Sequence, residues 1–250
     1  MGGSQFRFRH FTIRQDRCAM KVSTDSVILG CLTDPPSRGK ILDVGTGTGL
    51  LALMMAFRGG ESVDALEIEP EAAAQAAENV DASSMGGRIH VITGDFREFR
   101  PEAPYRLIIS NPPYFPPGVA AASRARDLSR STTSLTHRDL LLQSSALLEK
   151  GGMLSLCVPA TAVPALENTL TVTDLIISRR VAVRSVPAKP CYLEVLQLLK
   201  APGKTVLPIR EELCIRDSSG AYSEEYRRLV GATYADEWSG NRTTTGKEGA

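Results

Sequence analysis

The sequence predicts an α/β fold: a doubly wound, mostly parallel sheet of seven strands with an antiparallel hairpin at its edge. From Lys40 onwards, short apolar runs alternate with segments of helical periodicity, which is typical of parallel sheets covered by helices. The last two apolar runs are separated only by Pro187 to Pro190, too short for a helix, so we expect them to pair antiparallel. The chain of 250 residues is 42% apolar, enough for the core of one large domain.

Each predicted element has its own local signal. Short apolar runs bounded by turn residues predict strands over residues 40–44, 62–69, 88–96, 105–110, 153–159, 175–186 and 191–200. Pro70 stands where a first-turn proline belongs, and glycines close the segment that ends at residue 152. Helices are predicted over residues 49–58, 71–80, 139–152, 165–170 and 224–230.

The organisation along the chain is simple. Residues 1–39 are a lead-in, of which residues 1–4 (MGGS) resemble residues left by cloning and are excluded. Residues 40–236 form the α/β domain. Residues 237–250 are polar and rich in Gly and Thr, so we expect this tail to be disordered.

Composition excludes several classes of protein. The net charge is +1, so a nucleic acid or membrane partner has to be held by local patches. Five cysteines and three histidines are scattered without a CxxC pair or a Cys/His cluster, which predicts neither a disulfide framework nor a metal site. No apolar run approaches the roughly 20 residues of a membrane helix. We expect a cytoplasmic protein with free thiols and no signal peptide.

A glycine-rich loop, DVGTGTG, follows the first strand and opens a helix, where doubly wound sheets bind ligands. Its spacing is GxGxG, not the GxGxxG of dinucleotide sites, and Asp43 would repel a pyrophosphate. There is no GK[ST], so a P-loop is excluded. A carboxylate here suits the ammonium and sulfonium of S-adenosyl-L-methionine. The loop therefore predicts contacts to that cofactor from Asp43, Gly45, Thr46, Gly47 and Gly49.

The ends of the second and third strands support this cofactor. Glu67 is placed to accept both ribose hydroxyls, with Ile68 beside it, and Glu69 is the competing carboxylate on the same face. In the GDF sequence that ends the third strand, Asp95 can accept from an adenine amino group and Phe96 can cover the ring.

The fourth strand ends in NPPY, which predicts an acceptor site for an unreactive amine. Two prolines fix the backbone after Asn111, so the Asn111 amide oxygen and the Pro112 carbonyl form a stiff pair of acceptors. Accepting both protons of a planar NH₂ group localises its lone pair, mainly in the transition state. Tyr114 offers a face for a planar substrate to stack on.

The order DVGTGTG, LEIEP, GDF, NPPY resembles the class I S-adenosylmethionine-dependent methyltransferases that act on exocyclic or amide nitrogens. FTIRQDRCAMKVSTDSVILG, NPPYFPPGVAAASRARDLSRSTTSLTHRDLL and YSEEYRRL further resemble bacterial tRNA1(Val) adenine-N6 methyltransferases, which modify the adenine beside the valine anticodon. The similarity runs from about Phe6 to Tyr234.

This resemblance implies a Rossmann-like domain, methyl transfer at Asn111 and Pro112, stacking by Tyr114, and S-adenosyl-L-homocysteine as product. It implies cofactor contacts at Asp43, Gly45, Gly47, Glu67, Asp95 and Asn111. It also implies that Lys21, Thr24 and Asp25 close over the methionine end of the cofactor.

Two arginine-rich clusters are candidates for contact with tRNA phosphates. The first follows the NPPY loop and contains Arg124, Arg126 and Arg130. The second, on and after the sixth strand, contains Arg179, Arg180, Arg184 and Lys189. The alternative for any one of these side chains is an ordinary surface ion pair.

The expected function is methylation of N6 of adenine 37 in the anticodon loop of tRNA1(Val), by a monomer that needs no metal. The nearest alternatives are a protein glutamine-N5 methyltransferase, disfavoured by the short lead-in, and an rRNA guanine-N2 methyltransferase, whose motif resembles NPPF. A catalytically inactive RNA-binding scaffold is the alternative outside enzymes, and the intact glycine loop and NPPY argue against it.

Overall fold

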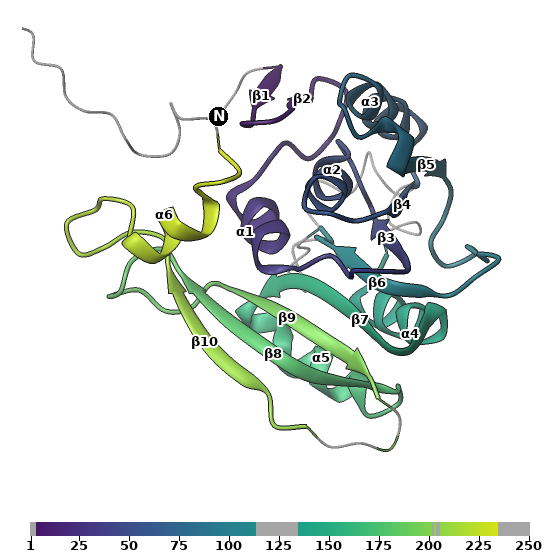
Figure 1. Ribbon diagram of the computed structural model, residues 1–250. Coiled ribbons are helices and arrows are strands. Elements are labelled where there is room, and N and C mark those ends of the chain that lie inside the picture. The colour runs from purple at the N-terminus through teal and green to yellow at the C-terminus, as the bar shows by residue number, and fades with distance from the viewer. Residues whose placement is uncertain (1–3, 114–134, 202, 204–205, 235–250) are drawn as a thin grey trace, which may run out of the picture.

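The computed structural model describes residues 4–113, 135–201, 203 and 206–234, and its centre is one twisted sheet of eight strands in the order β10-β8-β9-β7-β6-β3-β4-β5 (Figure 1). Neighbours pair in parallel except β9, which is antiparallel to both β7 and β8. The predicted α/β class with a doubly wound, mostly parallel sheet is confirmed. The strands of this sheet are β3 Lys40–Val44, β4 Ser62–Glu67, β5 Ile89–Thr93, β6 Tyr105–Ser110, β7 Leu148–Pro159, β8 Leu175–Arg184, β9 Leu193–Lys200 and β10 Ile209–Cys214.

Helices cover both faces of the sheet. The α-helices are α1 Thr24–Leu32, α2 Leu50–Phe57, α3 Pro70–Asp81, α4 His137–Leu147, α5 Val163–Leu170 and α6 Glu224–Val230, with short 3-10 turns at Gly86–Arg88 and Ala160–Ala162. Adjacent residues of a central strand face opposite layers: Ile41 packs in the cluster that holds α1, α2 and α6, whereas Leu42 packs in the one that holds α4 and α5. A separate hairpin, β1 Gln5–Arg7 with β2 Thr12–Arg14, lies beside α3.

The sheet differs from the sequence prediction at two places. Strand β10 makes an eighth strand, parallel to β8, and thereby takes the sheet edge from the β8–β9 hairpin. Four of its first five residues are exposed, so it shows no apolar run that could have revealed it. Helix α4, predicted over residues 139–152, ends at Leu147, and residues 148–152 instead begin β7. Gly151 there has φ 79°, which suits the bulged pairing of β7 with β6 and not a helix.

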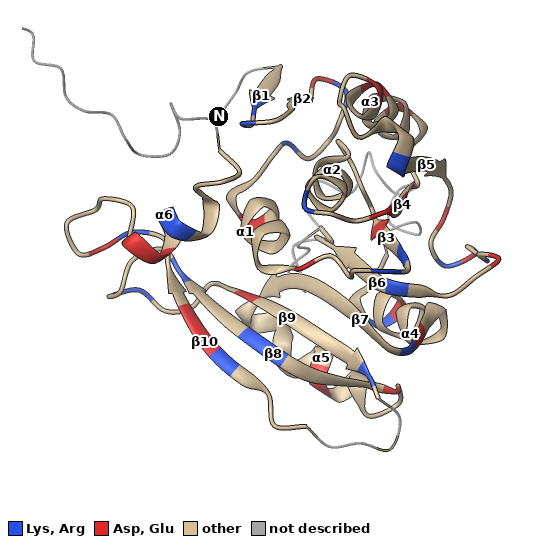
Figure 2. Cartoon of the chain, viewed as in Figure 1, with Lys and Arg blue, Asp and Glu red and all other residues tan. Residues whose placement is uncertain are grey.

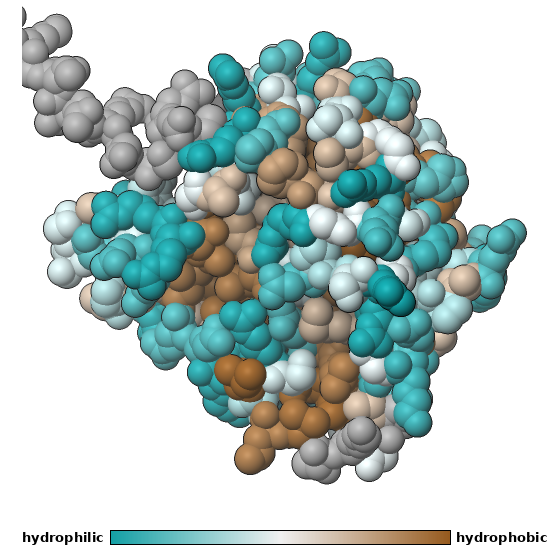
Figure 3. All heavy atoms as spheres, viewed as in Figure 1, coloured by the Kyte–Doolittle hydropathy of each residue, from teal (hydrophilic) through white to brown (hydrophobic). Residues whose placement is uncertain are grey.

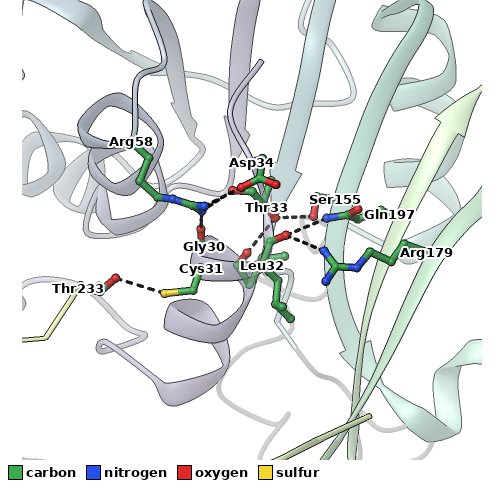
Figure 4. A network of polar contacts seen from close by, with 11 residues as sticks. Gly30, Cys31, Leu32, Thr33, Asp34, Arg58, Ser155, Arg179, Gln197 and Thr233 are labelled. Atoms are coloured by element: carbon green, nitrogen blue, oxygen red, sulfur yellow. Dashed lines mark hydrogen bonds and ion pairs between the residues drawn. The ribbon is translucent and has the colours of Figure 1, made fainter. Parts of the chain in front are cut away.

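Helix α1 is joined to the sheet through its C-terminal carbonyls, which a helix leaves without internal partners (Figure 4). Arg58, at the end of α2, donates to the carbonyls of Gly30 and Thr33 and pairs with Asp34 at 2.7 Å. The guanidinium thus replaces the missing turn of helix.

Side chains from the sheet complete the same cap. Gln197 of β9 and Arg179 of β8 donate to the Leu32 carbonyl at 3.0 and 3.2 Å. The hydroxyl of the fully buried Thr33 lies 2.6 Å from that of Ser155 on β7. As a result, α1 is fixed to three strands and to α2, although it precedes the first strand of the large sheet in the sequence (Figure 4).

Other surface features place few constraints on function. Exposed apolar side chains lie just before and at the start of β10, at the lower end of Figure 3, and include Leu207 at 90% exposure. None of the described helices is long and apolar enough to cross a membrane. Within the described ranges no group of three or more His, Cys, Asp or Glu could hold a metal ion, and all five cysteines are free.

The α1 cap predicts a specific loss of stability. Arg58→Met leaves two part-buried carbonyls without their charged donor, so the free energy of unfolding should fall by about 1–3 kcal/mol. Asp34→Asn removes only the ion pair to a side chain that is 84% exposed, and should change the same quantity by less than about 1 kcal/mol. Urea unfolding followed by circular dichroism measures both. Equal losses in the two variants would mean that the ion pair, and not the cap, stabilises α1.

Candidate active site

The carboxyl ends of β3 and β6 are held side by side at the point where the sheet order reverses. Ile41 to Asp43 pair in register with Leu107 to Ile109, and the Ser110 hydroxyl donates to the Val44 carbonyl at 2.9 Å. Val44 directly precedes the glycine loop, and Ser110 directly precedes Asn111. This hydrogen bond therefore fixes the spacing between the loop and the NPP segment.

Asp43 is the buried carboxyl group of the site. It is 0% exposed, and its Oδ2 accepts from the Thr46 hydroxyl at 2.5 Å and from the Ala52 backbone N–H at 3.0 Å, in the first turn of α2. Its Oδ1 is buried and has no hydrogen-bond partner among the described residues. Burial raises the pKa of Asp43 to about 7, although both hydrogen bonds oppose the shift. One oxygen holds the loop, and the other is left for a cationic ligand.

The glycine loop is open toward solvent and anchored from β4. Gly45, Gly47 and Gly49 all have positive φ, and a Cβ atom built on Gly45 or Gly47 would meet nothing within 4 Å. Glu67, 8% exposed at the end of β4, accepts from the Gly47 N–H at 2.8 Å and from the Glu69 N–H at 3.1 Å. The open cradle, the unpaired Asp43 oxygen and the Glu67 carboxylate are a donor and acceptor set that fits S-adenosyl-L-methionine.

The lead-in is tied to this loop through α3. The buried Asn79 donates to the carbonyls of Thr48 and Arg14, both at 2.9 Å, and accepts from the Arg14 N–H at 2.8 Å. Cys18, farther along the lead-in, has its pKa raised to about 11, mainly by burial and then by the charge of Glu67. Residues of the lead-in thus pass close to the predicted cofactor site.

Asp95 and Phe96, which the sequence predicts to contact the adenine of the cofactor, have different surroundings in the structure. The carboxylate of Asp95 is paired with Arg97, whose backbone N–H also donates to it at 2.9 Å, and hydrogen bonding from Arg97 lowers the pKa of Asp95. Phe96 is 4% exposed and packs in the cluster of Leu66 and Ile108, so its ring has no free face to cover an adenine. Ile68, in contrast, is 39% exposed beside Glu67.

Asn111 is held from both sides. Its Nδ2 donates to the Ser26 hydroxyl of α1 at 2.7 Å, and the Cys157 thiol of β7 donates to its Oδ1 at 3.0 Å. Ser26 is itself held by Ser23, the N-cap of α1, whose hydroxyl lies 3.0 Å away. These contacts direct the amide nitrogen toward α1 and turn the amide oxygen away from it. The Pro112 ring is buried beside it.

The KVSTD segment reaches the same edge, because Ser26 contacts Asn111. Thr24 begins α1 and is partly buried, and Lys21 is exposed just before it. Asp25 accepts from the Tyr192 hydroxyl at 3.0 Å. The structure therefore brings Asp25 to the edge that holds the NPP segment, and Tyr192, its partner in this hydrogen bond, directly precedes β9.

The second arginine cluster is largely neutralised by carboxylates. Arg179 pairs with Glu211 at 2.7 Å and Arg184 with Glu212 at 3.5 Å, so basic residues of β8 face acidic residues of β10 (Figure 2). Arg180 likewise pairs with Glu194 and Glu167. Lys189 is exposed, and its carbonyl accepts from Arg184 at 2.9 Å. Tyr114, Arg124, Arg126 and Arg130 lie outside the described residues.

Sequence reasoning missed the side chains that position Asn111. Ser26 and Cys157 come from two elements separated by 131 positions in the chain. Ser26 directly follows the predicted Thr24 and Asp25 within a segment that carries the family resemblance, and Cys157 and Tyr192 lie in predicted strands. These positions therefore lie within predicted elements or motifs, but nothing in the sequence indicates that their side chains meet at Asn111 or Asp25.

Comparisons with known proteins identify the family of this chain. The family model of the methyltransferase small domain matches residues 20–170. A tRNA1(Val) (adenine(37)-N6)-methyltransferase of Tolumonas auensis is 42% identical over 237 residues, which are 94% of this chain and 98% of that protein. One of Yersinia pseudotuberculosis is 38% identical over 236 residues, 93% of this chain and 92% of that protein.

Among solved structures, a protein of Agrobacterium tumefaciens described as a predicted O-methyltransferase superposes with a TM-score of 0.66 at 21% identity. The match covers 85% of this chain and 98% of that one, and it speaks for the fold alone. The resemblance that the motifs indicate is confirmed by the curated relatives. The chain belongs to the family of tRNA1(Val) (adenine(37)-N6)-methyltransferases.

Proposed function

We propose that this protein transfers a methyl group from S-adenosyl-L-methionine to N6 of an unpaired adenine in tRNA, at position 37 of tRNA1(Val). The observation that carries the proposal is the oriented Asn111 amide at the carboxyl end of β6, fixed by Ser26 and Cys157 beside the Asp43 and Glu67 carboxylates. The curated relatives at 38–42% identity bear the same activity in their names. Such a substrate places the reaction in the cytoplasm.

The cofactor would be held by groups at the ends of β3 and β4. When bound, S-adenosyl-L-methionine supplies an electrophilic methyl group. Asp43 Oδ1 is the acceptor for its cationic amino acid end, because it is buried and has no other hydrogen-bond partner among the described residues. Glu67 keeps acceptor capacity for ribose hydroxyls beyond its two backbone contacts.

The chain's own contribution to the reaction is the acceptor pair. Asn111 Oδ1 and the Pro112 carbonyl accept the two protons of the adenine amino group, so its lone pair is freed for attack. Cys157 occupies one acceptor position of Oδ1, and Ser26 prevents the amide from turning its NH₂ toward the substrate. The arrangement needs no strong base, because the proton is lost to solvent after transfer.

The activity is tested by nucleoside mass spectrometry. The protein is incubated with deuterated-methyl S-adenosyl-L-methionine and bulk tRNA from cells lacking the enzyme, and the digested nucleosides are analysed. We expect labelled N6-methyladenosine that maps to one valine tRNA. Labelled methylguanosine would change the target base. No label in RNA, with label in a protein glutamine, would replace the proposal by the protein methyltransferase alternative.

Replacing Asn111 should separate catalysis from cofactor binding. In Asn111→Ala, kcat should fall by about 10²–10³ or more, because an oriented acceptor of the transition state is lost. The Kd for S-adenosyl-L-methionine, measured by calorimetry, should stay within a few-fold. Asn168→Ala, which truncates an exposed asparagine of α5, is the matched control and should keep full activity. Near-normal transfer by Asn111→Ala would exclude the acceptor mechanism.

Asp43 predicts opposite pH dependences for stability and for cofactor binding. Its pKa rises from 3.8 to about 7 on folding, so the folded protein binds the proton more tightly than the unfolded chain. This group therefore makes the free energy of unfolding of the ligand-free protein fall as pH rises from about 4 to 7. Affinity for the cationic cofactor should instead rise as pH approaches 7 and Asp43 ionises.

Asp43→Asn should flatten both profiles. Urea unfolding and calorimetry between pH 5.5 and 7.5 test the two slopes on the same protein. A cofactor Kd that is constant over this range in the unsubstituted protein would show that Asp43 is not the titrating acceptor.

A further inference from the structure

Tyr192 is an exposed aromatic residue at the catalytic edge whose hydroxyl is already used. The side chain lies immediately before β9 and is 40% exposed, yet its hydroxyl donates to Asp25 at 3.0 Å. Its backbone is fixed as well, since its N–H donates to Val183 at 3.1 Å and its carbonyl accepts from Ala160 at 3.1 Å. Burial and the nearby Asp25 carboxylate raise the pKa of Tyr192, so the phenol stays neutral.

Strand register places Tyr192 at the same edge of the sheet as the NPP segment. In the order β9-β7-β6, Leu193 pairs with Pro159 and Ser110 pairs with Leu156. Tyr192 thus stands two strands from Asn111, roughly 10 Å sideways at the usual strand spacing, and about three residues farther along the edge.

From this position, the Tyr192 side chain points toward the first turn of α1. Its hydroxyl reaches Asp25, and the next residue, Ser26, contacts the Asn111 amide at 2.7 Å. The Tyr192 side chain therefore reaches from the start of β9 to the first turn of α1, the same turn that contacts Asn111.

The backbone and the hydroxyl of Tyr192 both form hydrogen bonds within the protein. The group that the side chain can offer to a ligand is therefore the flat apolar face of its ring. Such a face recognises planar groups by stacking, without preference for their hydrogen-bonding edge. The edges of the same planar group are then free for the Asn111 and Pro112 acceptors. A peptide backbone or a glutamine side chain has no comparable flat area to fill this face.

We propose that Tyr192 forms a wall of the acceptor site on which a nucleobase of the RNA substrate stacks, and that Asp25 is the positioning residue that holds this wall. The proposal rests on the proposed function for the identity of the substrate as RNA. This proposal places Asp25 on the substrate side of the site, whereas the sequence resemblance implied that Asp25 contacts the cofactor. Only an unpaired base can use such a wall, which agrees with a target in a loop.

Three variants test the proposal with an in vitro transcribed valine tRNA. Tyr192→Leu removes the ring and should lower kcat/KM for the tRNA about 10- to 100-fold, the range for loss of one base–aromatic stack. Tyr192→Phe keeps the ring but loses the hydrogen bond to Asp25, so kcat/KM should fall by a smaller factor, at most about 3-fold. Phe57→Leu is the matched control, because Phe57 is also 40% exposed but ends α2, the helix that begins at the glycine loop and runs away from the catalytic edge. The Kd for S-adenosyl-L-methionine and the Tm should stay unchanged in all three.

A binding readout keeps this proposal separable from the proposed activity. A transcript with 2-aminopurine in place of the acceptor adenine should lose fluorescence on binding the unsubstituted protein, because stacking quenches it, and lose less with Tyr192→Leu. Quenching that depends on Tyr192 without any methyl transfer would overturn the proposed function and support the wall. Methyl transfer that Tyr192→Leu leaves unchanged would overturn the wall alone. Equal loss in Tyr192→Phe and Tyr192→Leu would overturn it too, because the ring would then contribute nothing beyond its hydroxyl group.

Discussion

The parallel pairing of β3 with β6 is the constraint on which the site depends. It brings a glycine loop and an Asn-Pro-Pro segment, more than sixty positions apart in the chain, to one edge, and the Ser110–Val44 hydrogen bond locks the last step of the register. A slip of one residue would turn Asp43 to the opposite face of the sheet and destroy the site. The two helical layers, each packed on alternate residues of these strands, make such a slip costly.

Helix α1 extends this constraint to the catalytic amide. Its first turn supplies Ser26 to Asn111 and Asp25 to Tyr192, so its position decides both the orientation of the acceptor and the place of the ring. Its last turn is fixed by Arg58, Arg179 and Gln197. A helix of nine residues is too short to be stable alone, so these contacts and its buried face hold it.

The sequence was sufficient for features that depend on neighbours in the chain. The central strands have continuous apolar runs because both faces are buried, and the glycine loop needs positive φ at three positions. β10 could not be recognised, because its first residues are exposed and its partner β8 lies about thirty positions earlier in the chain. Phe96 also could not be placed, since a phenylalanine after a strand end can face the core or a ligand equally well.

The arginines of β8 show the same limit for recognition of RNA. In the sequence they form a basic cluster, but three carboxylates from β10 and β9 take up their charge in the fold. Paired arginines contribute little to counterion release, so this surface adds little to affinity for phosphates. With a net charge of only +1, the protein has a weak overall attraction for RNA. Under the two proposals above, contacts to an unpaired base from the Asn111 acceptor and the Tyr192 ring therefore carry more of the recognition than the arginines of β8 do.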